Sequence, residues 1–141
     1  MLTLDPAVRD AIVAHARRDH PDEACGLVVG PAGSGRAERV VEMTNAARSM
    51  TQYEFEPAEQ LRVYRDLDDR DEEVVVVYHS HTATEAYPSR TDVRYASQPD
   101  AHYVLVSTRD PGETEFRSFR IVDDVVTEEE IRISATVGGE A

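Results

Sequence analysis

The feature that most limits the possible folds is a run of five apolar residues, Val74 to Tyr78, that ends directly in His79, Ser80 and His81. A strand with one face in water alternates apolar and polar residues, whereas an unbroken apolar run is typical of a strand covered on both faces. We therefore expect this strand in the middle of a sheet that lies between helices. The two histidines would then stand at the end of a buried strand.

The rest of the chain supplies the helices and strands that such a layered fold needs. Asp5 followed by Pro6 is a typical helix start, and Val8, Ile12 and Ala16 recur on one face of that helix. The order of elements predicts an α/β fold, a three-layer α/β/α arrangement with a mixed sheet, as one domain over residues 1–141. The expected helices cover 5–19, 57–67 and 90–97, and the expected strands 23–30, 36–47, 74–78, 101–107, 114–122 and 129–135, with a frayed tail at 136–141.

Composition excludes several classes of partner. Asp and Glu number 28 against 15 Lys and Arg, and all of these cations are arginines. Nucleic acid binding needs a basic stripe that this chain lacks, so we expect no nucleic acid partner. We also expect no membrane partner, because no apolar run approaches the roughly 20 residues of a membrane-spanning helix. The lone Cys25 excludes an internal disulfide and the acidic start resembles no secretory signal, which together predict a cytoplasmic protein.

Strand geometry places the two histidines together. Alternate side chains of a strand share a face, so His79 and His81 should point the same way, along with Val75 and Val77. Two imidazoles on one face can each bind a zinc ion at about 2.0–2.1 Å, and a catalytic zinc takes three protein ligands and a water. Asp92 is the candidate third ligand, since it follows a loop that lets the chain turn back.

An ordinary structural role competes for this aspartate. Ser89 and Asp92 have the spacing of a capping box, in which the serine accepts a hydrogen bond from the helix backbone and the acid favours the helix N-terminus. Taken alone, the capping box is the better explanation. The same residues at fixed offsets behind two histidines and a buried strand favour a metal site.

These residues resemble the signature of a known family. "HSH", seven residues and then "SRTD" match the H-x-H-x(7)-S-x(2)-D pattern of the JAMM (MPN+) zinc metallopeptidases, whose fold is similar to that of cytidine deaminases. Glu23 matches the glutamate that the family carries after its first helix. The resemblance implies that His79, His81 and Asp92 bind Zn²⁺, that Glu23 deprotonates the zinc-bound water, and that Ser89 donates a hydrogen bond to the oxyanion.

The resemblance also implies a substrate. Many members read "HSHP" where this chain has Thr82, but the wider stretch resembles the short bacterial members. The resemblance is strongest to an actinobacterial member that removes cysteine from the C-terminus of a ubiquitin-like sulfur-carrier protein, which implies a carrier ending in Gly-Gly as partner and a role in cysteine biosynthesis. Two alternatives stay open, an isopeptidase or amidase with another substrate and a non-catalytic MPN scaffold. Whether the chain forms a homodimer is also left open.

Several other residues could carry chemistry, and each has a simpler explanation. Cys25 lies in an apolar strand and is expected to be a small core residue rather than a nucleophile. Ser80 should face away from the histidines. The loop "GPAGSG" lacks a following Lys-Ser/Thr, so we expect a hairpin loop rather than a phosphate site. Three histidines are expected on a helix surface or in a strand, with no metal role: His15, His20 and His102.

Overall fold

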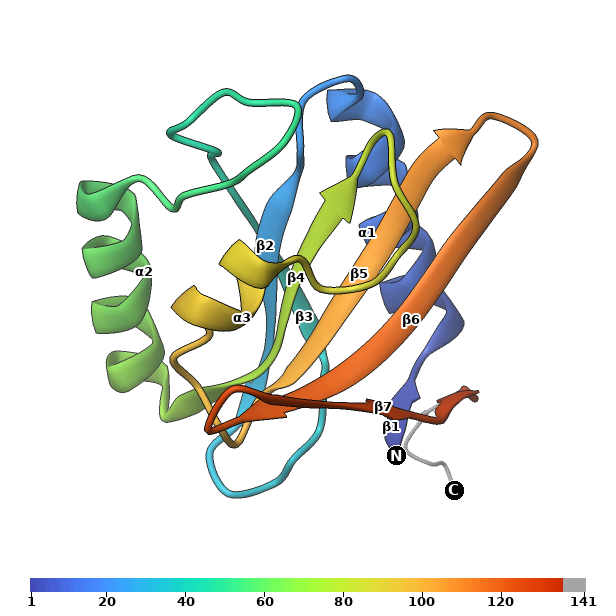
Figure 1. Cartoon of the computed structure of the whole chain (residues 1–141). Coiled ribbons are helices and arrows are strands. Elements are labelled where there is room, and N and C mark those ends of the chain that lie inside the picture. The colour runs from blue at the N-terminus through green and yellow to red at the C-terminus, as the bar shows by residue number, and fades with distance from the viewer. Residues whose placement is uncertain (136–141) are drawn as a thin grey trace.

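The computed structural model describes residues 1–135, which form the predicted alternation of helices and strands (Figure 1). The predicted tail at 136–141 lies outside the described residues. In chain order the elements are β1 (Leu2–Leu4), α1 (Pro6–Asp19), β2 (Cys25–Pro31), β3 (Arg39–Met43), α2 (Pro57–Arg70), β4 (Glu72–His81), α3 (Arg90–Tyr95), β5 (His102–Asp110), β6 (Glu113–Val122), β7 (Val125–Glu129) and β8 (Ile131–Ile133).

The main sheet is mixed, as predicted, and its strand order is β3-β2-β4-β5-β6-β7. Strands β4 and β5 are parallel, and the other neighbouring pairs are antiparallel. The apolar strand β4 therefore lies in the interior of the sheet, with β2 on one side and β5 on the other. This position explains its unbroken valine run.

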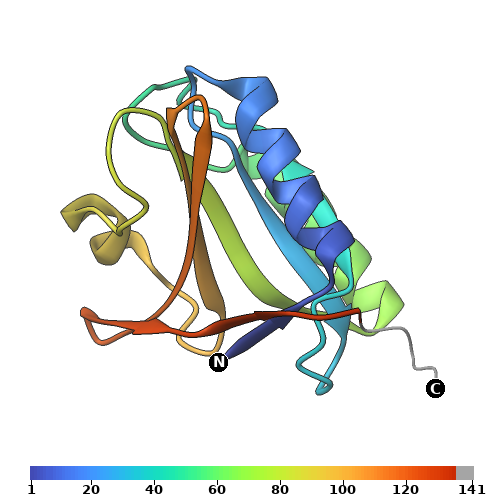
Figure 2. The same ribbon diagram turned by 90° about the vertical axis from the view of Figure 1, so that its right-hand side faces the viewer.

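Helices cover both faces of this sheet, which confirms the three-layer arrangement. On one face, Val8, Ile12 and Ala16 of α1 pack into a buried cluster with Val28 and Tyr78. The other face carries a second buried cluster, to which α2 contributes a leucine and α3 a valine. Figure 2 shows α1 and α3 on opposite sides of the sheet, and Figure 1 shows α2 beside the β3–β2 edge.

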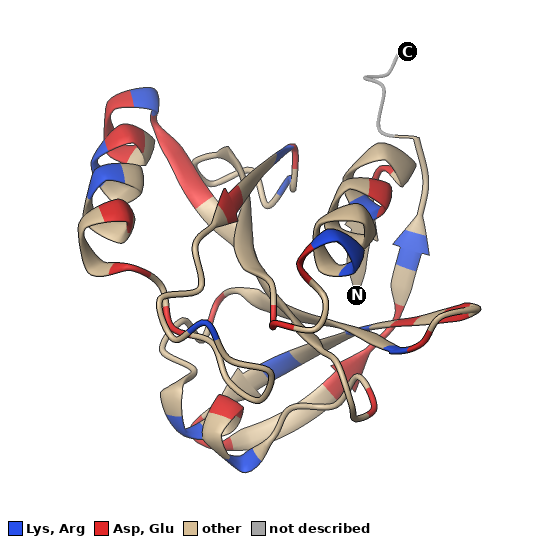
Figure 3. Cartoon of the chain, turned by 90° about the horizontal axis from the view of Figure 1, so that it is seen from above, with Lys and Arg blue, Asp and Glu red and all other residues tan. Residues whose placement is uncertain are grey.

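The termini of the helices follow from their sequences. Asp5 caps α1 by accepting a hydrogen bond from the Ala7 amide at 2.8 Å, and Pro6 occupies the first turn. Helix α2 runs three residues beyond the predicted end at Leu67 and stops at Asp71, whose φ of 55° is left-handed. Residues 68–70 form the last turn of α2, and Glu72 already begins β4. Acidic and basic residues are interspersed along α2 (Figure 3).

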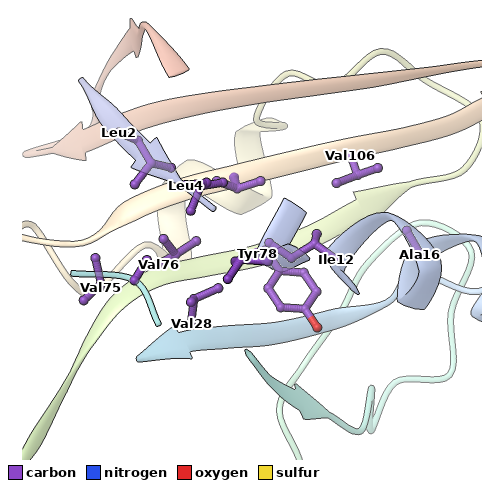
Figure 4. Packing of buried hydrophobic residues seen from close by; sticks show 12 residues of the cluster. Leu2, Leu4, Ile12, Ala16, Val28, Val75, Val76, Tyr78 and Val106 are labelled. Carbon is purple, nitrogen blue, oxygen red and sulfur yellow. The ribbon is translucent and has the colours of Figure 1, made fainter. Parts of the chain in front are cut away.

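A β-bulge corrects one prediction about β4. Val76 pairs with Val28 and Val74 with Val29, so Val75 is an extra residue between two adjacent partners. Val75 and Val76 consequently both enter the cluster on the α1 face (Figure 4). The expectation that Val75 shares the face of the histidines is wrong, because the bulge shifts the alternation by one residue.

The C-terminal strand prediction also needs correction, because residues 129–135 are not one strand. Strand β7 ends at Glu129 and forms a hairpin with β6 through Asp123 and Asp124, both with positive φ, as a tight two-residue turn requires. Strand β8 instead pairs in parallel with β1, where Leu2 lies opposite Ile131. Strand β1 was not predicted, because a strand of three residues is too short to show a period.

The Gly/Pro/Ser loop joins β2 to β3 as a hairpin, as predicted, with positive φ at Gly33 and Gly35. Among residues 1–135, none of the helices has the length and apolarity that crossing a membrane requires.

Candidate active site

Strand β4 delivers both histidines to the face that α2 and α3 cover. His79 lies opposite Cys25 of β2 and Leu105 of β5, and His81 opposite Ser107 of β5. Both imidazoles are buried, and their ring centroids are 5.1 Å apart. The predicted placement of the pair on one face is confirmed.

The capping box of α3 brings the aspartate to the histidines. Ser89 Oγ accepts a hydrogen bond from the Asp92 amide at 3.0 Å, and Asp92 Oδ2 accepts one from the Ser89 amide at 2.8 Å. The same Oδ2 atom lies 3.1 Å from Nε2 of His79 and 3.0 Å from Nε2 of His81. The capping box and the ligand cluster are therefore not alternatives, because one carboxylate belongs to both.

These three side chains are positioned to bind a metal ion. Their ligand atoms all lie within 4.8 Å of one another. His81 Nδ1 lies 2.9 Å from the Glu85 carbonyl oxygen, and because a carbonyl only accepts, Nδ1 carries a proton and Nε2 is the nitrogen that can bind a metal ion. The ring of His79 stacks on Tyr53 at 4.4 Å between centroids. Nδ1 of His79 has no hydrogen-bond partner among the described residues, and Nε2 meets only the Asp92 oxygen that His81 also contacts, so a metal ion between these groups would satisfy a buried polar cluster.

Electrostatics favours a ligand set that is ready for a cation. Burial lowers the pKa of His79, which keeps its ring neutral and able to ligate. Burial opposes ionisation of Asp92 as well, but its contacts with His79 and His81 outweigh that effect and hold the pKa of the carboxyl well below its usual range. Burial also disfavours the charged form of His81, yet its interactions with Asp92 and the Glu85 carbonyl raise its pKa.

Glu23 lies directly before β2, and its backbone is fixed from both sides. Its amide donates to the Ser49 carbonyl at 2.8 Å, and its own carbonyl accepts from Asn45 Nδ2 at 3.0 Å. The side chain is 3% exposed, and Oε1 has no hydrogen-bond partner within residues 1–135. Burial, together with the nearby charge of Asp92, raises the pKa of Glu23 to about 8.

Ser80 connects the histidine strand to Glu23. As predicted, it faces away from the two imidazoles, and it is fully buried. Its amide donates to the Ala24 carbonyl at 3.0 Å, and its Oγ accepts from the Ala24 amide at 2.8 Å. Because Ala24 follows Glu23, these bonds fix the position of the carboxylate relative to the two histidines.

The other candidate residues have structural roles. Cys25 is a free thiol that is buried in the core, as predicted, and burial raises its pKa to about 12. The prediction of a surface position for His15 is wrong, because the ring is buried and bonds Tyr78 and Asp19. His20 lies 2.7 Å from the Thr108 hydroxyl, and His102 lies 2.6 Å from the Glu129 carboxylate.

Two contributors to the site could not be found from the sequence. Glu85 acts through its backbone carbonyl, which leaves no side-chain signal. Tyr53 lies in the irregular segment between β3 and α2, where no periodicity indicates the direction of its ring. Thr82, the departure from the family pattern, donates its hydroxyl to the Met50 carbonyl at 3.1 Å. Proline could not make this bond, so Thr82 helps to hold the same segment against β4.

The fold and this site define a class, an α/β/α domain with a buried His-His-Asp cluster beside a buried glutamate. Residues 5–122 match the model of a family described as prokaryotic homologs of the JAB domain. The chain belongs to this family, which confirms the predicted JAMM relationship.

Comparison with individual proteins gives finer detail. The chain is 65% identical over 124 residues to the CysO-cysteine peptidase of Mycobacterium tuberculosis, covering 88% of this chain and 85% of the relative. It is 32% identical over 111 residues to a desampylase of Haloferax volcanii, covering 75% and 80%. The solution structure of protein DSY2949 from Desulfitobacterium hafniense has a TM-score of 0.83 at 35% identity and covers 96% and 94% of the two chains. These relatives confirm the prediction of an enzyme.

Proposed function

We propose that this protein is a zinc peptidase that hydrolyses the C-terminal Gly–Cys bond of a ubiquitin-like sulfur-carrier protein and releases cysteine. The observation that carries the proposal is the convergence of three metal-ligand atoms beside the buried Glu23 carboxyl, whose Oε1 has no hydrogen-bond partner within residues 1–135. The choice of substrate is supported by 65% identity to a CysO-cysteine peptidase. A single domain and a cytoplasmic location belong to the same proposal, and the free, buried Cys25 supports the latter.

Zinc suits this donor set of two imidazoles and one carboxylate. Held by His79, His81 and Asp92, it supplies a Lewis acid that polarises the substrate carbonyl and lowers the pKa of a bound water. Neutral imidazole rings and an ionised aspartate are the forms that ligate, and burial of His79 and the contacts of Asp92 favour those forms.

In this reaction Glu23 moves the proton. Its carboxylate takes a proton from the attacking water, the new C–O bond forms, and the proton passes to the nitrogen as the C–N bond breaks. A group that both accepts and donates works best with a pKa near the operating pH. Burial brings the pKa of Glu23 into that range, at about 8.

Ser89 stabilises the charge that develops on the carbonyl oxygen. Its Oγ already accepts from the Asp92 amide, so the hydroxyl proton is left to donate. A donor that is already fixed in place loses little reorganisation energy when the oxyanion forms. The capping box therefore holds this serine in one orientation as well as starting α3.

A cleft of about 520 Å³ runs from Asp92 between α2 and α3 and offers a place for the carrier tail. Aromatic side chains narrow it, among them Tyr53, Tyr95 and Tyr103. Glycines fit such a channel because they have no Cβ, and an extended tail can add its backbone hydrogen bonds. We therefore assign the Gly-Gly end of the carrier to this cleft.

The test uses zinc-loaded protein and two carriers, one ending in Gly-Gly-Cys and one with the last glycine replaced by valine. We expect loss of a single cysteine from the glycine form, seen by mass spectrometry, and much slower loss from the valine form. Equal rates for the two carriers, or no cleavage of the glycine form, would refute the carrier assignment.

A second candidate is isopeptidase activity on a protein conjugate, which the 32% identity to a desampylase favours. The same site chemistry applies to both. The two candidates are distinguished by comparing the carrier that ends in Gly-Gly-Cys with a carrier joined to a lysine side chain by an isopeptide bond. The second candidate predicts that the isopeptide conjugate is cleaved faster.

A further inference from the structure

A pair of hydrogen bonds joins the walls of the cleft of about 520 Å³ that reaches Asp92. Gln98, in the segment between α3 and β5, donates its side-chain amide to the Tyr64 hydroxyl of α2 at 2.9 Å. Its backbone amide donates to the Tyr103 hydroxyl of β5, also at 2.9 Å. All three residues line the cleft. We call this arrangement of Tyr64, Gln98 and Tyr103 the Gln98 bridge.

The register of the sheet places the Gln98 bridge relative to the metal ligands. Tyr103 lies opposite Val77 of β4, and Val77 stands two residues before His79 on the same face of that strand. A strand advances about 3.3 Å per residue, so the bridge lies about 7 Å along the sheet from His79. An extended tail that begins at the metal ligands therefore meets the bridge after about two residues.

The side chains of the bridge are fixed by packing as well as by hydrogen bonds. Tyr103 is 5% exposed and belongs to the buried cluster on the face of the sheet that carries the ligands. Tyr64 packs against the same cluster. Because both rings are held, Gln98 cannot move aside without losing both bonds. The bridge is therefore a firm boundary at this end of the cleft.

A tail that meets this boundary has to turn away from the sheet toward the open side of the cleft. Glycine suits the turning position, because it has no Cβ to contact the Gln98 side chain and adopts positive φ at little cost. The next residue of the tail, directly before the cut, lies near Tyr53, whose ring stacks on His79 at 4.4 Å between centroids. Each of the two glycines thus meets a different side chain.

We propose that Gln98 is a specificity-determining residue, which restricts the tail to glycine at the position two residues before the cut. This inference rests on the proposed function and deepens it, since it assigns the first glycine of Gly-Gly to a named group. Gln98 does not contact the three metal ligands, so its effect belongs to the choice among tails and not to the hydrolytic chemistry.

The experiment compares two ubiquitin-like carriers that differ in one methyl group, with tails that end in Gly-Gly-Cys and Ala-Gly-Cys. Zinc-loaded wild-type protein should cleave the glycine form roughly 10- to 100-fold faster in kcat/KM, as expected when a methyl group is forced into a filled space. Gln98→Ala makes room for that methyl group and should cleave the Ala-Gly-Cys form faster than wild type does. Most of the preference should therefore disappear.

Two further variants separate the bridge from a general widening of the cleft. Tyr64→Phe keeps the ring and removes only the hydroxyl that holds Gln98, so it should lose part of the preference. Gln60→Ala is the matched control, because Gln60 lines the same cleft from α2 and, in the described part of the chain, makes no side-chain hydrogen bond to the other wall. This variant should keep the full preference.

A binding measurement gives the same comparison without turnover. Calorimetry uses carriers that lack the cysteine and end in Gly-Gly or Ala-Gly. Wild-type protein should bind the Gly-Gly form more tightly, and Gln98→Ala should bind the two forms with similar affinity.

The outcomes separate this inference from the proposed function. Equal wild-type rates on the two carriers would overturn the role of Gln98 and leave the peptidase assignment intact. The wild-type preference in folded Gln98→Ala, or in Tyr64→Phe if Gln98→Ala does not fold, would also overturn it. Equal relaxation by Gln60→Ala would do the same, because that result marks a general widening. Cleavage of neither carrier by zinc-loaded wild-type protein would overturn the proposed function and the inference with it.

Discussion

Two buried histidines on opposite faces of the sheet differ in one respect. His15 and His79 are each 2% exposed. His15 Nδ1 lies 2.6 Å from the Tyr78 hydroxyl, and its Nε2 lies 3.1 Å from Asp19. In His79, the residue after Tyr78, Nδ1 has no hydrogen-bond partner within the part of the chain that the structure describes, and Nε2 only shares the Asp92 oxygen, 3.1 Å away, with His81.

The difference distinguishes a histidine that stabilises the fold from one that is available to bind a metal ion. A buried polar group left without a partner costs about 1–3 kcal/mol, so a fold keeps one only where something else satisfies it. His15 is fully satisfied and stabilises the packing of α1. At the site, His79 Nδ1 and Glu23 Oε1 have no hydrogen-bond partner within residues 1–135, and His79 Nε2 shares one carboxylate oxygen with His81, an arrangement that a metal ion and a water would complete.

The variant with the largest expected effect on activity is Glu23→Gln. The amide keeps the shape of the side chain but cannot carry the proton, so we expect activity on the carrier to fall by about 10²–10⁴-fold. Zinc content should not change, because Glu23 is not among the three ligands. Turnover close to the wild-type rate would show that another group activates the water.

Ser89→Ala should have the next largest effect. Loss of the oxyanion donor should reduce kcat by about 10²–10³-fold. Since the serine also caps α3, the variant should lose about 1 kcal/mol of stability, measured by denaturant unfolding. Ser89→Thr keeps both the cap and the hydroxyl and should recover most of the activity. If Thr and Ala were equally slow, the hydroxyl would not be the donor.

Tyr78→Phe tests the supporting histidine. The change deletes the hydroxyl that bonds His15 and leaves a buried nitrogen unsatisfied, so we expect a loss of about 1–3 kcal/mol in the free energy of unfolding. Activity at temperatures where the variant is folded should stay close to wild type. A large loss of zinc or of kcat in the folded variant would contradict the division of roles between the two faces.

The pH dependence of the metal-free protein tests the raised pKa of Glu23. Burial raises the pKa of Glu23 from 4.5 to about 8, so the folded carboxyl holds a proton that the unfolded chain releases. Its contribution to stability is present below the unfolded pKa and is lost as the pH rises through about 8. Between about pH 5 and about pH 9, wild type should therefore lose more unfolding free energy than Glu23→Gln. Parallel pH profiles would contradict the raised pKa.

The site was predictable because its information is local. His79 and His81 stand two apart on one strand, and Ser89 and Asp92 form a capping box whose spacing is readable without a structure. The central position of β4 followed from the valine run. These features depend on period and spacing, which tertiary contacts leave intact.

Features set by distant contacts could not be predicted. The bulge at Val75 depends on the pairing with β2, and the short strands β1 and β8 exist because the chain ends meet. The burial of His15 depends on Tyr78, which is far away in the sequence.

Metal analysis of purified wild-type, His79→Ala and His15→Ala proteins tests the central claim most directly. The account predicts about one zinc per chain in wild type and in folded His15→Ala, and loss of zinc in His79→Ala, as expected for a three-ligand site. Stoichiometric zinc in His79→Ala, or equal loss of zinc from both variants when folded, would contradict the claim that His79, and not His15, is a metal ligand.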